Sequence, residues 1–244
     1  MNIAIILAAG VGQRMRSAGL PKQFLKLFGK PIIIYTLEKF EQCEDIDRVV
    51  IVCREGYLDH MRSLLALYHI GKVQRIVIGG RDRQESLQRG LDAAEDIGGQ
   101  ADDIVLIHDG VRPLVEERTI RENIRVAQQY GCAVTVAPVI ESVVITEHAD
   151  AEMQDVKKRA ATYSLTAPQS FRLGEIRAAY EHAAAQAGAD GMPLLDAAMV
   201  YASTGKKMHL VKEQNRNIKI TTPEDFYYLK AMIELEENKF VFGL

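Results

Sequence analysis

The chain has 244 residues, 48% of them hydrophobic, and a formal net charge of −3 at pH 7. This length suits one large α/β domain whose core needs neither disulfides nor a metal, and the slightly acidic balance gives no support for binding to nucleic acids or membrane surfaces, which would require a basic excess. The three cysteines are odd in number and widely separated, which argues against a disulfide framework or a structural zinc site.

Short apolar runs rich in β-branched residues alternate with longer stretches in which apolar residues recur at helical spacing. The first run, 2–8, is too short to span a bilayer and has no basic lead-in, so we expect a strand there and a cytosolic protein. Further strands are predicted at 48–53, 73–79, 103–109, 132–139 and 207–212, and helices at 60–70, 83–97, 119–131, 171–188 and 223–239. Continuous apolar strands predict a mostly parallel sheet buried on both faces, in a doubly wound α/β fold.

The segment 141–164 interrupts this alternation. It is polar, with one short β-like run, VVIT, and no long helical face. The sequence therefore predicts a β-arm that leaves the core. We expect residues 1–244 to form a single domain from which this arm protrudes.

The loop after the first strand, LAAGVGQRMRSAGLPKQF at 7–24, combines glycines with positive charge. Gly10 and Gly12 allow backbone N–H groups to approach phosphate oxygens closely. A dinucleotide fingerprint would need glycine where Met15 stands, and a Walker loop would need Gly-Lys-Ser/Thr, so neither motif is present. Two arginines and Lys22 suit a triphosphate undergoing reaction better than a dinucleotide that is only bound. A tight turn with solvated surface cations accounts for the same residues equally well.

Asp109 ends the apolar run DIVLIHD. Ligands of open α/β sheets bind beyond the carboxyl ends of the strands, and a carboxylate there can hold Mg²⁺, which takes oxygen ligands and bridges phosphates. A turn or helix cap explains Asp-Gly after a strand as well. Arg112 follows three residues later and either faces the same cleft or pairs with Glu116 or Glu117 on the surface. The neighbouring His108 is expected to be a packed or capping residue.

A family resemblance rests on several motifs in a fixed order. L-A-A-G-x-G-x-R-M and L-P-K-Q-F resemble the signature of sugar-nucleotide and polyol-nucleotide transferases, and P-K-Q resembles in particular the cytidylyltransferases that activate methylerythritol 4-phosphate or ribitol 5-phosphate. GGRDRQESL at 79–87, HDGVRP at 108–113, APQSF at 167–171 and NIKITTPED at 217–225 continue the resemblance. It implies a Rossmann-like nucleotidyltransferase that joins CTP to a polyol phosphate with the help of Mg²⁺ and releases pyrophosphate.

The resemblance also implies roles for individual residues. Arg14 and Lys22 match the positions that neutralise charge on the α-phosphate during catalysis, and Asp109 matches the metal ligand. The implied nucleotide-binding residues are Ala8, Ala9, Gly10, Gly12, Arg83, Ser86 and Lys219. The implied acceptor-binding residues are Arg112, Ser142 and Arg159. In the family the arm that carries Arg159 reaches a second subunit, so a homodimer is implied.

The chain departs from the family pattern where the acceptor would bind. Glu141 and Ser142 stand where methylerythritol-phosphate enzymes usually have Asp-Thr, and Ala167 replaces a usual threonine. A hydrogen-bonding pocket discriminates strongly between hydroxyl patterns, so these changes leave the acceptor open. Methylerythritol 4-phosphate, for isoprenoid precursors, is our first expectation. Ribitol 5-phosphate or a related pentitol or pentulose phosphate, for wall or capsule polymers, is the second.

Two other classes of protein compete with this interpretation. A protein that binds a CDP-linked metabolite without catalysis would be expected to lack Arg14, Lys22 or Asp109, and all three are present. An NAD-dependent dehydrogenase is disfavoured by Met15 and by the missing acidic residue for the ribose.

Overall fold

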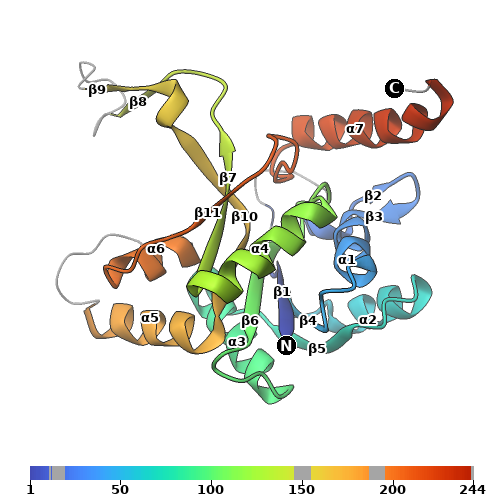
Figure 1. Cartoon of the computed structure of the whole chain (residues 1–244). Coiled ribbons are helices and arrows are strands. Elements are labelled where there is room, and N and C mark those ends of the chain that lie inside the picture. The colour runs from blue at the N-terminus through green and yellow to red at the C-terminus, as the bar shows by residue number, and fades with distance from the viewer. Residues whose placement is uncertain (11, 13–19, 146–154, 187–195, 243–244) are drawn as a thin grey trace.

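Seven strands form one twisted sheet in a computed structural model of the chain, which describes residues 1–10, 12, 20–145, 155–186 and 196–242 (Figure 1). The sheet order is β11-β7-β10-β6-β1-β4-β5. Its parallel members are β1 (Asn2–Ala8), β4 (Arg48–Cys53), β5 (Val73–Ile78), β6 (Ile104–Asp109), β7 (Cys132–Pro138) and β11 (Leu210–Lys212). The antiparallel β10 (Tyr163–Arg172) lies between β6 and β7. The predicted mostly parallel α/β fold is therefore confirmed.

Helices cover both faces of this sheet. On one face lie α1 (Ile32–Gln42), α2 (Leu58–Leu67) and α4 (Glu117–Tyr130), and on the other lie α3 (Arg83–Asp96), α5 (Leu173–Gln186) and α6 (Ala197–Ser203) (Figure 1). In α4, Ile120 and Ile124 are buried against the sheet, while Arg121 and Arg125 on the opposite side form surface ion pairs. Such one-sided burial is what the apolar spacing in the sequence predicts.

A smaller third layer lies beyond the carboxyl ends of the strands. It contains the hairpin of β2 (Lys26–Leu27) and β3 (Lys30–Pro31) and the last helix, α7 (Pro223–Phe242) (Figure 1). These elements share an apolar cluster of Leu27, Ile32, Val111, Leu114, Ile220 and Leu229. The cluster holds the start of α7 close to the end of β6. None of the described helices combines the length and apolarity that a bilayer span requires.

Strand β10 is absent from the sequence expectation, although it lies within the sheet. Its sequence, YSLTAPQSFR, is polar and contains proline, which normally argues against an internal strand. The buried side chains of Gln169 and Ser170 each have a partner: Ser170 Oγ donates to Asn123 Oδ1 at 3.2 Å, and Gln169 Oε1 accepts from Ala198 N at 3.0 Å. These partners come from elements distant in sequence, so the chain offers no local signal for the strand.

The predicted arm contains a separate two-stranded sheet of β8 (Val143–Ile145) and β9 (Asp155–Lys157), with Val144 opposite Val156. Figure 1 shows it projecting from the carboxyl end of β7 and the beginning of β10. A 3₁₀ turn, η3 (Arg159–Ala161), leads back to the main sheet. Residues 146–154 of the predicted arm lie outside the described residues.

Candidate active site

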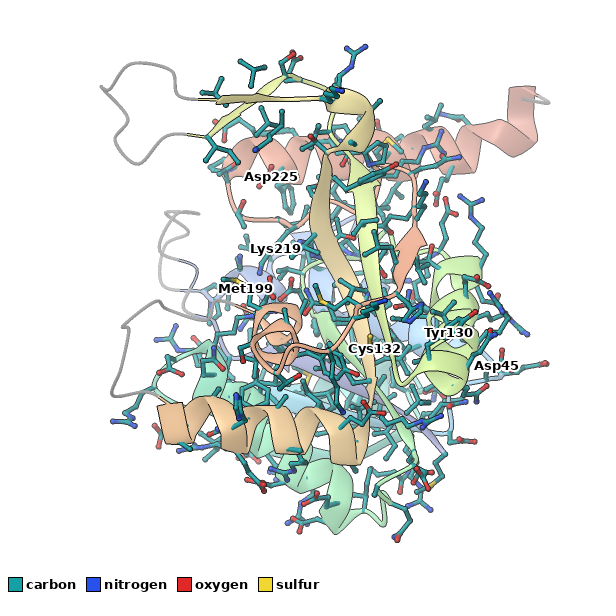
Figure 2. All side chains as sticks on the ribbon, turned by 60° about the vertical axis from the view of Figure 1, so that its left-hand side comes forward. Asp45, Tyr130, Cys132, Met199, Lys219 and Asp225 are labelled. Atoms are coloured by element: carbon teal, nitrogen blue, oxygen red, sulfur yellow. The ribbon has the colours of Figure 1, made fainter. Side chains whose placement is uncertain are left out.

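A cavity of about 450 Å³ opens at the carboxyl ends of β1, β5 and β6. Most of the predicted site residues line it, namely Ala8, Ala9, Gly10, Gly12, Lys22, Arg83, Ser86, Asp109 and Lys219. Figure 2 shows Lys219 between Asp225, at the start of α7, and the body of the sheet. A wider hollow of about 830 Å³ lies between α2 and β5, but none of the predicted residues lines it. The smaller cavity is therefore the candidate active site.

Two glycines allow the loops around this cavity to approach one another. Gly12 has a φ of +68°, which favours glycine, and a Cβ atom there would lie 3.2 Å from Cγ of Lys22. A Cβ atom on Gly79 would lie only 2.2 Å from Cβ of Ala9, so the loop after β5 could not pack against the loop after β1. Both glycines are thus required by the shape of the cavity.

Lys22 and Gln23 tie the first loop to its surroundings. Nζ of Lys22 donates to the carbonyl of Ile220 at 2.8 Å, so this lysine is not a freely solvated side chain. Nε2 of the buried Gln23 donates to the carbonyl of Ala8 at 2.6 Å. Gln23 is not among the residues predicted from the sequence, although it stands within the P-K-Q motif. Arg14, the other predicted catalytic cation, lies outside the described residues.

Asp109 is the electrostatic centre of the site. Its carboxylate oxygens form ion pairs with Arg83 Nη1 at 2.7 Å, Arg112 Nε at 3.0 Å and Lys219 Nζ at 3.1 Å. The side chain of Asp109 is only 7% exposed. Burial alone would raise the pKa of Asp109, but the three cations, Arg83 most strongly, hold this pKa well below its usual value. Asp109 is therefore ionised at neutral pH. It does not cap α4, because Glu116 occupies the N-cap position.

The combined positive charge of Arg83, Arg112 and Lys219 is larger than the single negative charge of Asp109, with which all three pair. Burial lowers the pKa of Lys219, and the neighbouring Arg83 and Arg112 lower it further, against the attraction of Asp109. Arg83 also begins α3, whose N-terminus favours anions, and the side chain of Asp82 already accepts from Glu85 N there at 2.8 Å. An excess of positive charge at a helix N-terminus, inside a cavity, is suited to a polyphosphate.

His108 and Arg112 belong to one compact turn after β6. His108 is fully buried against Phe40, and its Nε2 lies 3.0 Å from the carbonyl of Arg112. Burial lowers the pKa of His108 to about 4, so the ring is neutral and its Nε2–H can donate to that carbonyl. The prediction of a packed histidine is confirmed. Arg112 pairs with Asp109, whereas Glu116 and Glu117 pair with arginines of their own helix.

Several polar residues brace the rim of the cavity. The hydroxyl of Ser86 accepts from Gly80 N at 3.0 Å and donates to the carbonyl of Asp82 at 2.7 Å, so Ser86 shapes the loop after β5. At the start of α7, the carboxylate of Asp225 accepts from the backbone and hydroxyl of Thr221, each at 2.7 Å. These bonds fix Thr221 at the N-terminus of α7, and Lys219, two residues earlier, lines the cavity.

The predicted acceptor-binding residues are not all brought together. Nη1 of Arg112 donates to the carbonyl of Asn217 at 2.8 Å, which fixes the guanidinium beside Asp109. Ser142 and Arg159 are exposed on the side of the arm, and neither is among the described residues that line the cavity. Arg112 does not line the cavity either, but its guanidinium pairs with Asp109, so of these three residues only Arg112 lies beside the site within one chain.

The described residues around the cavity offer few ligands for a metal ion. Among the described residues no group of three or more histidines, cysteines or carboxylates could enclose a metal ion. Mg²⁺ commonly takes one or two carboxylates and completes its shell with substrate phosphates and water. Asp109 can supply such a carboxylate, and a triphosphate can supply the remaining oxygen ligands.

The chain is similar in sequence to known proteins over nearly its whole length. The model of the 2-C-methyl-D-erythritol 4-phosphate cytidylyltransferase family matches residues 2–235. The ribitol-5-phosphate cytidylyltransferase of Vibrio parahaemolyticus is 41% identical over 243 residues, and that of Streptococcus agalactiae serotype III is 39% identical over 244 residues; each match covers 100% of both chains. The 2-C-methyl-D-erythritol 4-phosphate cytidylyltransferase of Clostridium novyi is 38% identical over 96% of each chain.

Solved structures are similar over nearly the whole chain. That of 4-diphosphocytidyl-2C-methyl-D-erythritol synthase from Anaerococcus prevotii has a TM-score of 0.81, with 27% identity and 96% of each chain covered. That of 2-C-methyl-D-erythritol 4-phosphate cytidylyltransferase from Thermus thermophilus has a TM-score of 0.71, with 26% identity and coverage of 95% of this chain and 98% of the other.

Proposed function

Because the chain belongs to the 2-C-methyl-D-erythritol 4-phosphate cytidylyltransferase family, whose members are nucleotidyltransferases, we propose that it transfers the cytidylyl group of CTP to ribitol 5-phosphate. The observation that carries the reaction class is the convergence of Arg83, Arg112 and Lys219 on Asp109, which lines the cavity. Cations fixed in this way suit a reaction in which charge develops on phosphate oxygens.

The choice of acceptor rests on the relatives and on the acceptor half of the sequence. Two relatives that match the full length at 41% and 39% identity are named for ribitol 5-phosphate. The departures from the methylerythritol-phosphate pattern, at Glu141, Ser142 and Ala167, fall in the segments expected to bind the acceptor. Methylerythritol 4-phosphate, our first expectation from the sequence, is the second candidate, and the relative from Clostridium novyi at 38% identity supports it.

The proposed chemistry is a displacement at phosphorus. An oxygen of the acceptor phosphate forms a bond to the α-phosphorus of CTP, and the bond from that phosphorus to the bridging oxygen breaks, so the electron pair leaves with pyrophosphate. Lys22 and Arg14 would neutralise charge on the α-phosphate, while Arg83 and Lys219 would hold the remaining phosphates. Mg²⁺, held by Asp109 together with the phosphates, would supply further charge neutralisation.

We also propose a homodimer formed through the arm, in a cytosolic protein. The arm exposes apolar side chains, with Val144, Ile145 and Val156 exposed by 45%, 53% and 49%, and contact with a second subunit would bury them. Arg159 is exposed near the base of the same arm and could then reach the acceptor site of the partner. The double variant Val144→Asp, Val156→Asp should have the molar mass of a monomer when it is measured by light scattering. A dimer that persists in this variant contradicts the arm interface.

The decisive experiment is pyrophosphate release from CTP and Mg²⁺, with ribitol 5-phosphate and methylerythritol 4-phosphate offered in parallel. Turnover of ribitol 5-phosphate, lost in Lys22→Ala, supports the proposal, and turnover of methylerythritol 4-phosphate alone establishes the second candidate. A protein that binds CTP but releases no pyrophosphate with a wider panel of polyol and sugar phosphates would be a binding protein, and the proposed reaction would be wrong.

A further inference from the structure

The carboxyl ends of β6, β7 and β11 meet at the same edge of the sheet, with β10 between β6 and β7. Arg112 follows β6, and Glu213 follows β11, where its backbone N–H donates to the carbonyl of Val136 at 2.9 Å. Thr166 lies on β10 at this edge. Apart from Lys219, the predicted nucleotide-binding residues follow β1 and β5, whereas this second group lies beside Arg112, the predicted acceptor-binding residue.

Three polar atoms are enclosed together at this edge. Thr166 Oγ1, Glu213 Oε1 and Asn217 Oδ1 are buried, and none of them makes a hydrogen bond of good geometry within the described part of the chain, although the side chains of Thr166 and Asn217 lie beside Glu213. Glu213 is only 8% exposed and Asn217 only 4%. Burying an unpaired polar group is costly, so a cluster of three is unusual unless it serves a purpose.

This cluster is connected directly to Arg112. The backbone carbonyl of Asn217 accepts from Arg112 Nη1 at 2.8 Å, and the amide of Asn217 donates to the carbonyl of Ala167 at 2.8 Å. The charged groups that face Glu213 are Arg112, which attracts it, and Glu116, which repels it. The charge on Glu213 therefore acts on the guanidinium that the family resemblance assigns to the acceptor phosphate.

We propose that Glu213 is a positioning residue for the acceptor half of the site, and that through its charge and its contact with Asn217 it sets how strongly Arg112 attracts the acceptor phosphate. This inference rests on the proposed function, because it assumes that a phosphate ester binds beside Arg112. When Glu213 is protonated, it no longer offsets the positive charge of Arg112, which only Asp109 then partly neutralises. When Glu213 is ionised, it offsets part of that charge and weakens binding.

Glu213 changes its charge near neutral pH. Burial raises the pKa of Glu213 to about 7, although the Thr166 hydroxyl, Arg112 and the Asn217 side chain each act in the opposite direction. The acceptor phosphate also changes its charge in this range, with a second pKa of about 6. The charge of the ligand affects every protein variant alike. The ratio of the dissociation constants of two variants for the same ligand, at the same pH, therefore reports on Glu213 alone.

The test is a calorimetric titration of ribitol 5-phosphate, with methylerythritol 4-phosphate in parallel, in the presence of a CTP analogue that cannot react. The full-length wild type is compared with Glu213→Gln, which cannot ionise, and with Glu213→Asp, which can. Glu122→Gln removes one carboxylate from the exposed face of α4, where it pairs with Arg125 at 2.7 Å, and serves as the matched control.

At about pH 6 the wild type and Glu213→Gln should bind the acceptor alike, whereas at about pH 8 the wild type should bind it about 3 to 10 times more weakly. Glu213→Asp and Glu122→Gln should keep the pH dependence of the wild type, and affinity for the CTP analogue should not change. The inference would be overturned if the ratio of acceptor dissociation constants between the wild type and Glu213→Gln stayed constant with pH. It would also be overturned if the affinity for the CTP analogue changed with pH by the same factor as that for the acceptor.

The same titrations separate this inference from the proposed function. A wild type that binds the acceptor with the expected pH dependence but releases no pyrophosphate would contradict the reaction and support the role of Glu213. A wild type and Gln variant that bind neither phosphate ester at any pH would contradict both. If the wild type and Glu213→Gln both turned over the acceptor with parallel pH profiles, the role of Glu213 would be contradicted and the proposed reaction would stand.

Discussion

Replacing Asp109 with asparagine tests the electrostatic account of the site most directly. Asparagine keeps the size of the side chain, so packing is preserved while the negative charge is lost. Three cations then face one another without a counter-charge. Removing one partner from a buried ion pair costs about 3–5 kcal/mol. Arg83 and Lys219 remain 36% and 34% exposed and can turn towards water, so we expect a smaller loss of stability, about 2–3 kcal/mol.

Urea unfolding with and without inorganic pyrophosphate measures this effect. Since the unbalanced cations favour an anion, pyrophosphate should raise the unfolding free energy of Asp109→Asn more than that of the wild type. Pyrophosphate release from CTP and Mg²⁺ should fall by about 10²-fold or more. Asp96→Asn is the control, because Asp96 is 62% exposed and lies 3.8 Å from Arg75; its stability should stay within about 0.5 kcal/mol of the wild type.

The outcome that refutes this reasoning is specific. If Asp109→Asn unfolds at the same urea concentration as the wild type, and pyrophosphate stabilises the two proteins equally, then Asp109 does not neutralise the cation cluster. The excess of positive charge described for the cavity would then have no energetic effect.

Three further predictions concern other residues of the site. Lys22→Ala should lower the rate of pyrophosphate release by about 10²- to 10³-fold, with about 1 kcal/mol of lost stability from the bond to Ile220, as measured by steady-state kinetics and urea unfolding. Gly79→Ala should destabilise the fold by about 1–3 kcal/mol through the contact with Ala9 and weaken binding of CTP in a calorimetric titration; unchanged stability would mean that the loops can separate freely. Because the pKa of Glu213 is raised from 4.5 to about 7 in the folded protein, the fold keeps a proton that the unfolded chain loses, so stability should fall between these pH values by at most about 3 kcal/mol. Melting curves of Glu213→Gln should lack this fall, and identical pH dependence in both proteins would contradict it.

The sequence predicts most of the fold because parallel strands bury both faces and therefore appear as continuous apolar runs, as in β1, β4 and β6. The residues at the ends of those strands and their loops were also predictable, since open α/β sheets place ligands there. Asp109 is the best example. Strand β10 could not be predicted because its buried polar side chains depend on partners such as Asn123 and Ala198, which only the folded chain brings near.

Glu213 was missed for a related reason. A glutamate after a short strand is normally solvated, and nothing in its immediate sequence indicates burial. Its burial arises because β11 pairs with β7, and because the segment after β11 folds back over Arg112. Gln23, in contrast, stands within a motif that was recognised, and its buried contact with the Ala8 carbonyl was open to prediction from that motif.

The attachment of the segment 217–220 to earlier parts of the chain has a consequence for synthesis of the protein. Asn217 binds Arg112, Lys219 binds Asp109, and Ile220 binds Lys22 through its carbonyl. A polypeptide emerging from the ribosome can pair β1, β4, β5 and β6 long before this segment has been translated, because domains fold from the N-terminus as they emerge. The growing chain therefore holds a folded sheet with an incomplete cavity until residue 220 is free. Competence to bind nucleotide should therefore appear abruptly during translation, once residues 217–220 have left the ribosome.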